Sequence, residues 1–221
     1  MNFEQIKGKI ENYLSGGKKI FTSSSFQTHS IPLLHIVSII DPSIPVYFLN
    51  TGYHFPETLE FRDYIAEMLK LNLVNLKPDT PKNMQLDADG KLLFTSDPDH
   101  CCYLNKTQPM ERVLMYHDVW INGIRAEQNS YRSALKIEEV AKHNVIRFHP
   151  LIGWTNKDIY EYRKKFDLPE HPLESKGYFS IGCEPCTRKV DLDMQEREAR
   201  WYGLNKTECG INTDLVKNQL E

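Results

Sequence analysis

Short apolar runs alternate with helical patterns along most of this sequence, and this alternation limits the folds that the chain can adopt. Apolar runs that are rich in β-forming residues occupy 18–24, 44–50, 71–76, 118–124 and 144–151. Helical patterns at 56–70 and 155–166 lie between several of them. Alternation of this kind is typical of βαβ units. We therefore predict an α/β fold with a mostly parallel sheet and helices on both faces, in which ligands bind at the carboxyl ends of the strands.

The segments outside this alternation predict a single main domain with a dependent end. Residues 1–14 combine charges with apolar residues at helical spacing, which indicates an amphipathic helix rather than a signal peptide. Residues 78–109 are rich in Asp, Pro, Asn and Lys and predict an irregular region. Later loops lead to a charged helix at 193–204 and a polar tail that looks mobile. We expect a nucleotide-binding domain at 1–180 and a C-terminal segment at 181–221 that belongs to the same domain.

Charge and hydropathy exclude several classes of protein. The 27 basic and 30 acidic residues give a net charge of −3, so nothing draws the whole chain toward nucleic acid or a membrane surface. No apolar run approaches the roughly 18 residues of a membrane span. We expect a cytoplasmic protein, in which the five cysteines do not form structural disulfides.

A run of hydroxyl residues follows the first apolar strand, in the stretch IFTSSSFQTHSIPLLHIV. Thr22 to Ser25 come at the strand end, and Thr28 and Ser30 mark the start of a helix. Unpaired N–H groups at such a junction can hold a phosphate, although this is not a Walker A loop. A Ser-rich turn that only caps a helix is the alternative.

Two further strand ends carry polar residues. Thr51-Gly52 precedes a well-formed helix start at Pro56, and Arg125 and Gln128 follow the strand near 120. Taken alone, these are a helix start and solvated loop residues.

Four of the cysteines form two pairs, Cys101-Cys102 and Cys183-x-x-Cys186. A zinc ribbon normally uses two closely spaced C-x-x-C knuckles, and a redox dithiol opens a helix, so neither fits well. Four thiolates from two separate loops suit an iron–sulfur cluster. From spacing alone, a cluster, a zinc site and incidental cysteines all stay open.

Two features near the C-terminus are candidates for anion chemistry. Arg197 and Arg200 lie three apart on the expected helix, so both point to one face and could grip an anion, unless acidic residues one turn earlier pair with them. Cys209 lies in the polar tail near Lys206. It is either incidental or a nucleophile that reaches into a site.

Taken together and in this order, these motifs resemble the sulfonucleotide reductases, a family of assimilatory adenylyl-sulfate and phosphoadenylyl-sulfate reductases within the PP-loop group. The resemblance runs from about Lys18 to Asn212 and rests on SSSF, TGYHFPET, CCYLNKTQPM, GIRAEQ, GYFSIGCEPCTR, EREARW and ECGI.

The resemblance implies a Rossmann-like adenine-nucleotide-binding fold and a set of site residues. The implied nucleotide-binding residues are Ser23, Ser24, Ser25, Phe26, Thr28, Asn50, Thr51, Gly52, Arg125 and Gln128. The implied ligands of a [4Fe–4S] cluster are Cys101, Cys102, Cys183 and Cys186. The implied catalytic residues are Lys106 between cluster and substrate, Arg197 and Arg200 on the phosphosulfate, and the nucleophile Cys209.

The activity that the resemblance implies is thiol-dependent reduction of adenylyl sulfate to sulfite and AMP. Cys209 would form an S-sulfocysteine, which thioredoxin or glutaredoxin would resolve in trans, and a homo-oligomer is expected. Three residues depart from the family pattern: Gln27 stands for a loop glycine, Asn50 for an aspartate and Asn212 for a histidine.

Three other functions stay open from the sequence. TGYHFPET looks more like the phosphoadenylyl-sulfate branch, so that substrate, or both, is the first alternative. A PP-loop ATP pyrophosphatase or sulfurtransferase would need a Gly-rich phosphate loop, which SSSFQTHS lacks. The third is a zinc-stabilised binding module without catalysis.

Overall fold

The fold is built on one six-stranded sheet. The protein is described here by a computed structural model, which covers residues 1–191, 193–194, 197–203, 206 and 208–216. The strands are β1 (Ile20–Ser23), β2 (Pro45–Leu49), β3 (Asn72–Leu76), β4 (Val119–Ile121), β5 (Glu138–Val140) and β6 (Ile146–Phe148). Their order is β3-β2-β1-β4-β6-β5, and all neighbours are parallel except β5 and β6. The predicted mostly parallel α/β sheet is confirmed.

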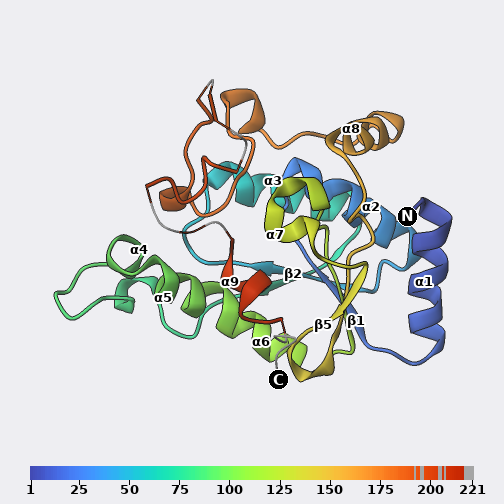
Figure 1. Ribbon diagram of the computed structural model, residues 1–221, viewed down its shortest axis with the longest axis horizontal. Coiled ribbons are helices and arrows are strands. Elements are labelled where there is room, and N and C mark those ends of the chain that lie inside the picture. Colours follow the sequence, from blue (N-terminus) through green and yellow to red (C-terminus); the bar gives the residue numbers. More distant parts are fainter. Residues whose placement is uncertain (192, 195–196, 204–205, 207, 217–221) are drawn as a thin grey trace.

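Helices cover both faces of the sheet (Figure 1). The helices of the described chain are α1 (Phe3–Ser15), α2 (Ile31–Ile40), α3 (Pro56–Met68), α4 (Leu93–Ser96), α5 (Pro98–Cys102), α6 (Gln108–Leu114), α7 (Ser130–Ser133), α8 (Asn156–Lys165) and α9 (Gly210–Thr213). The predicted helix at 1–14 is confirmed as α1, in which Asn2 and Gln5 cap the first turn reciprocally. The helices predicted at 56–70 and 155–166 are α3 and α8.

Alternating side chains on the central strands divide the core between the two faces. Val119 and Ile121 pack with Ile6 and Ile36, on the face that α1, α2 and α8 cover. Trp120, between them, packs with α6 on the opposite face. Because successive strand residues point to opposite sides, one short strand anchors both layers.

The segment 78–109, which we predicted to be irregular, is partly helical, so that prediction was wrong for its second half. The Asp97 carboxylate accepts a 2.9 Å bond from the His100 N–H and starts α5. A π-helical turn at Tyr103–Thr107 then joins α5 to α6. Cys101 and Cys102 therefore lie on a helix rather than in a loop.

The charged helix predicted at 193–204 is absent from the described part of that segment; 195, 196 and 204 lie outside the described residues. Residues 199–201 instead pair with residues 186–188 through the bonds Arg188 N–H to Ala199 C=O and Trp201 N–H to Cys186 C=O, at 3.1 and 3.0 Å. Trp201 has a φ of 53°, which ends any helical path there.

The polar tail is docked in its described part. Leu215 is fully buried, and its carbonyl accepts a 2.9 Å bond from the Lys142 N–H, while Val216 forms a bridge to Ala141. Within the described residues no helix is both long and apolar enough to cross a membrane.

Candidate active site

A large cavity of about 850 Å³ lies at the carboxyl ends of the central strands. Ser23 at the end of β1, Leu49 at the end of β2 and Asn122 after β4 all contribute to its wall. This is the edge at which open parallel sheets bind their ligands, and the volume suits a nucleotide-sized molecule.

The hydroxyl loop after β1, predicted to hold a phosphate group, forms part of this wall. Ser23, Ser24 and Ser25 all line the cavity. The Trp120 indole N–H donates to the Ser23 hydroxyl at 2.8 Å, and the Phe26 N–H donates to the Ser24 hydroxyl at 3.0 Å. The loop is therefore held from the core side, with its serines facing the cavity.

Gln27, which stands where the family pattern has glycine, ties this loop to the C-terminal segment. Its amide N–H donates to the Ser25 hydroxyl at 3.0 Å, and its amide oxygen accepts from the Ile181 N–H at 2.9 Å. The side chain thus bridges the two walls of the cavity.

Five of the expected nucleotide-binding residues do not line the cavity: Phe26, Thr28, Asn50, Thr51 and Gly52. Phe26 is fully buried against Phe48, and the Thr28 hydroxyl donates to Glu174. Asn50 and Gly52 form a turn in which the Gly52 N–H donates to the Asn50 side chain at 3.3 Å, with a Gly52 φ of 74°. These residues shape the loops behind the site.

Arg125 and Gln128 do line the cavity, together with Arg132. Arg125 is 1% exposed and donates to Asn156 at 2.8 Å and to Glu127. The Gln128 amide oxygen accepts from the Arg125 N–H at 3.1 Å and from the Arg132 guanidinium. One amide oxygen therefore holds the Arg125 backbone and the Arg132 guanidinium.

The two cysteine pairs, distant in sequence, meet in the structure. Cys101, Cys102, Cys183 and Cys186 line one small cavity beside the large one, together with Lys106. The Thr51 hydroxyl lies 3.4 Å from the Cys183 sulfur. Burial raises the pKa of Cys101 to about 12, and the neighbouring thiols add to this. Burial also opposes ionisation of Cys183, but Lys106 and Thr51 hold its pKa below the ordinary value.

The donor set, four thiols around one small cavity, is compatible with an iron–sulfur cluster. Among the described residues no three His, Cys, Asp or Glu side chains converge on one ion. In a [4Fe–4S] cluster each cysteine binds its own iron, so four thiols that surround a common space without converging are compatible with it. All four are free cysteines.

Lys106 lies between the two cavities and lines both of them. It belongs to the π-helical turn and is 9% exposed. Burial lowers the pKa of its ammonium, but the charges of Cys183, Cys209 and Cys102 more than offset this and hold it above the ordinary value. Lys106 is therefore a buried cation between the cysteine cluster and the ligand cavity.

Arg197 and Arg200 face the same cavity from the C-terminal segment. Arg200 donates to the Ile181 carbonyl at 3.1 Å, and its guanidinium lies 4.5 Å from the centre of the Trp201 ring. Among the described residues, the Nε atoms of both arginines are buried without a hydrogen-bond partner. Burial, together with the charge of Arg132, lowers the pKa of Arg197 to about 10. Unpartnered buried donors favour an anionic ligand, which would accept their bonds.

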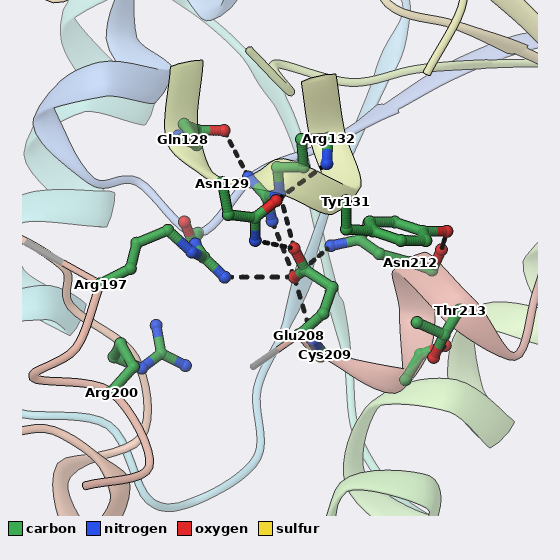
Figure 2. A network of polar contacts seen from close by, with 12 residues as sticks. Gln128, Asn129, Tyr131, Arg132, Arg197, Arg200, Glu208, Cys209, Asn212 and Thr213 are labelled. Atoms are coloured by element: carbon green, nitrogen blue, oxygen red, sulfur yellow. Dashed lines mark hydrogen bonds and ion pairs between the residues drawn. The ribbon is translucent and has the colours of Figure 1, made fainter. Parts of the chain in front are cut away.

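Cys209 lines the cavity as well, and the residue before it is the centre of a polar network (Figure 2). The buried Glu208 carboxylate accepts bonds from Arg132, Arg197, Asn129, Asn212 and the Cys209 N–H. Sequence reasoning missed Glu208 and Arg132 as site residues. The only signal was their position, Glu208 beside Cys209 and Arg132 four residues after Gln128.

The cavity wall is predominantly cationic. Its basic side chains include Lys106, Arg125, Arg132, Arg197, Arg200 and Lys206. Its carboxylates are Glu127, Glu198 and Glu208. A chain with a net charge of −3 thus concentrates positive charge where a thiol, hydroxyl groups and the strand ends meet.

The chain is similar to known proteins over most of its length. The model of the phosphoadenosine phosphosulfate reductase domain matches residues 19–189. An adenosine 5′-phosphosulfate reductase from Chelativorans sp. is 43% identical over 195 residues, which are 87% of this chain and 78% of that protein. A phosphoadenosine 5′-phosphosulfate reductase from Gloeobacter violaceus is 36% identical over 200 residues, 89% of this chain and 83% of that protein.

Among solved structures, the phosphoadenylyl-sulfate reductase of Candida auris in its phosphate complex aligns with a TM-score of 0.69. The alignment covers 80% of this chain and 87% of that one at 22% identity. This likeness concerns the fold.

Proposed function

The chain belongs to the phosphoadenosine phosphosulfate reductase family, and on that basis we propose that it reduces adenylyl sulfate to sulfite and AMP. The observation that carries the proposal is that Cys209, Lys106, Arg197 and Arg200 line one cavity with the serine loop. Thiol attack on an activated sulfate requires a thiol, cations that neutralise the sulfate oxygens and a loop that can hold a phosphate group. The cavity offers a thiol, three such cations and the serine loop.

In the first step the Cys209 thiolate attacks the sulfur of the sulfate group. A sulfur–sulfur bond forms while the bond from sulfur to the AMP phosphate oxygen breaks, and AMP leaves with that electron pair. The electrophile is anionic, so cations must neutralise its oxygens in the transition state. Lys106, Arg197 and Arg200 supply them, and the unpartnered Nε donors of the arginines can bind the oxygens.

In the second step a dithiol donor such as thioredoxin or glutaredoxin attacks the Cys209 sulfur. Sulfite leaves, and the donor's second thiol then displaces Cys209, so that the donor ends as a disulfide. Cys209 is only partly buried, which leaves an approach for a protein thiol once the tail opens.

Cys101, Cys102, Cys183 and Cys186 would hold a [4Fe–4S] cluster. When bound, it would supply iron-held thiolates whose negative charge favours the ammonium form of Lys106. Lys106 then presents a fixed cation to the substrate side.

The test uses anaerobically purified protein. Iron and acid-labile sulfide are measured first, and the protein is then incubated with adenylyl sulfate or with its 3′-phosphorylated form. Intact mass spectrometry follows the sulfo adduct, and peptide mapping locates it. We expect four irons per chain and a sulfo adduct at Cys209 after incubation with adenylyl sulfate. The Cys209→Ser variant should form no adduct.

Other outcomes would redirect the proposal. An adduct from the 3′-phosphorylated nucleotide alone would assign that substrate. Zinc instead of iron, together with no adduct from either nucleotide, would contradict a reductase and return the cysteines to a structural role.

A further inference from the structure

The residue before the nucleophile is a buried carboxylate that has no role in the chemistry proposed above. The Glu208 side chain is 5% exposed and forms ion pairs with two arginines, Arg132 at 2.7 Å and Arg197 at 3.2 Å. Burial opposes its ionisation, but the hydrogen bonds and charge of Arg132, with the charge of Arg197, hold the pKa of Glu208 well below its ordinary value. A buried charge is retained only where a partner compensates it.

Arg132 is the bidentate partner, and contacts other than those with Glu208 also hold it in place. Its Nε and Nη2 donate to the two Glu208 oxygens at 2.7 and 2.9 Å, which is a bidentate pair. Its backbone N–H donates to Asn129 at 2.8 Å, and its third nitrogen donates to Gln128. The guanidinium is therefore pre-oriented on the α7 side of the cavity.

Glu208 in turn contacts the backbone of Cys209, the residue that carries the thiol. Its Oε1 atom accepts the backbone N–H of Cys209 at 3.0 Å and the Asn212 amide at 3.0 Å. The carboxylate thus holds the main chain at Cys209 and the side chain of Asn212, on either side of the turn that carries the thiol (Figure 2).

Asn212, at the position of the family's histidine, adds a second anchor of the same kind. Arg147 is fully buried and donates to the Asn212 side chain and, at 3.4 Å, to its carbonyl, which also accepts from the Tyr131 hydroxyl at 2.7 Å. Two buried arginines therefore hold the tail, one through Glu208 and one through Asn212.

We propose that Glu208 is a positioning residue: clamped by Arg132, it holds the Cys209 backbone so that the thiol faces the ligand cavity. This deepens the proposed function and rests on it for the identity of the nucleophile. Glu208 does not touch the reacting atoms, so its replacement should slow sulfur transfer without weakening nucleotide binding.

The test compares Glu208→Gln with the unaltered chain, both with their bound cofactor. Gln keeps the shape of the side chain but lacks the negative charge that compensates the arginines. Removing one partner of a buried ion pair strongly destabilises the contact. Hydrogen exchange of the 208–216 amides should therefore accelerate by at least about tenfold, while the amides of β1 and β4 keep their rates.

Single-turnover formation of the Cys209 adduct provides the second readout. The maximal rate should fall at least about tenfold in Glu208→Gln, whereas the half-saturating nucleotide concentration should not rise. Arg132→Lys, which keeps the charge but loses the fork, should lie between the two chains. Glu57→Gln, which breaks a surface pair with Lys176, is the matched control and should change neither readout.

Two results would overturn the proposal. The first is unchanged exchange of the tail amides in Glu208→Gln, and the second is a raised half-saturating concentration at an unchanged maximal rate. If the unaltered chain forms no adduct at all, the proposed function fails, but the exchange experiment still decides whether Glu208 holds the tail.

Discussion

The two walls of the ligand cavity are held together by different forces. The strand side is an apolar structure, in which Phe21 and Trp120 are buried between parallel strands and α6. The opposite side, formed by the C-terminal segment, combines a few buried apolar side chains such as Leu215 with polar contacts such as Arg132–Glu208 and the Ile181 N–H to Gln27. Apolar burial resists every displacement, whereas a few directional bonds can open together without unfolding the core. We therefore predict that the strand side of the cavity, which we call the floor, is rigid. The C-terminal segment opposite it, which we call the cover, should be able to open.

The largest effect should come from the floor. Phe148 is fully buried and packs against Tyr13. Phe148→Ala removes this packing and leaves a cavity, so the free energy of unfolding in urea should fall by about 3–5 kcal/mol. Ile39→Ala at an exposed position should change it by less than about 0.5 kcal/mol. Equal effects of the two replacements would remove the distinction.

Shortening a buried apolar side chain in the cover should destabilise only the C-terminal tail. Leu215 is as fully buried as Phe148 but belongs to the docked tail. Leu215→Ala should lower the free energy of tail opening by about 2–4 kcal/mol, as judged from amide exchange at 208–216. The sheet amides should exchange as before, because the tail can open while the core persists. Equal loss of protection in both places would show that the tail unfolds only with the core.

Acid should destabilise the loop that precedes the C-terminal segment. The His171 ring is buried between α3 and the following loop: its Nε2 lies 3.1 Å from the Thr58 hydroxyl, and its Nδ1 accepts from the Leu173 N–H at 3.2 Å. Burial lowers the pKa of His171 to about 4. The unfolded chain therefore binds a proton at His171 more readily than the folded chain does. The contribution of neutral His171 to the free energy of unfolding is complete above about pH 6.5 and is lost as the pH falls toward 4.

Urea unfolding between pH 7.5 and 4.5 measures this contribution. The unaltered chain should lose about 2 kcal/mol more than His171→Gln over that range. Parallel pH profiles of the two chains would show that His171 does not contribute.

The smallest effect should leave the free energy of unfolding unchanged and lower only the rate of the reaction at Cys209. A Cβ at Gly182 would lie 2.2 Å from the Arg200 Nη2 atom. Gly182→Ala should displace this guanidinium and lower the rate of Cys209 adduct formation by about tenfold, or about 1.4 kcal/mol. Gly153→Ala has open space around the added carbon and should match the unaltered chain. A normal rate in Gly182→Ala would mean that Arg200 does not bind the reacting group.

The parts of the fold that the sequence predicted are those with strong local patterns. Apolar runs and helix starts located five strands and the longer helices, but β5, with the sequence Glu138-Glu139-Val140, has no apolar alternation and was missed. The helical stretch around Cys101 and Cys102 was also missed, because the abundance of Asp, Pro, Asn and Lys in 78–109 suggested an irregular region. Pro98 instead lies at a helix start, and Pro109 follows a π-helical turn, where the regular bonding is already interrupted.

The site shows the same limit. Charged and nucleophilic residues could be named from motifs, and the cavity contains Cys209, Lys106, Arg197 and Arg200 as expected. The Glu208–Arg132 pair could not be predicted, since it joins residues far apart in the chain and each alone looks like a surface charge. The helix predicted at 193–204 was wrong in the described residues because pairing with residues 186–188 outweighed local helix propensity.

The docked tail has a kinetic consequence. The chain is attached to the body on both sides of Cys209, before it through the pairing of Trp201 with Cys186 and after it through Leu215 and Val216. When the Glu208 contacts break, the thiol therefore moves on a tethered loop rather than on a free end. Tethering keeps the effective concentration of the thiol at the cavity high. A loop opened in this way would return to the cavity rapidly after each encounter with a reductant.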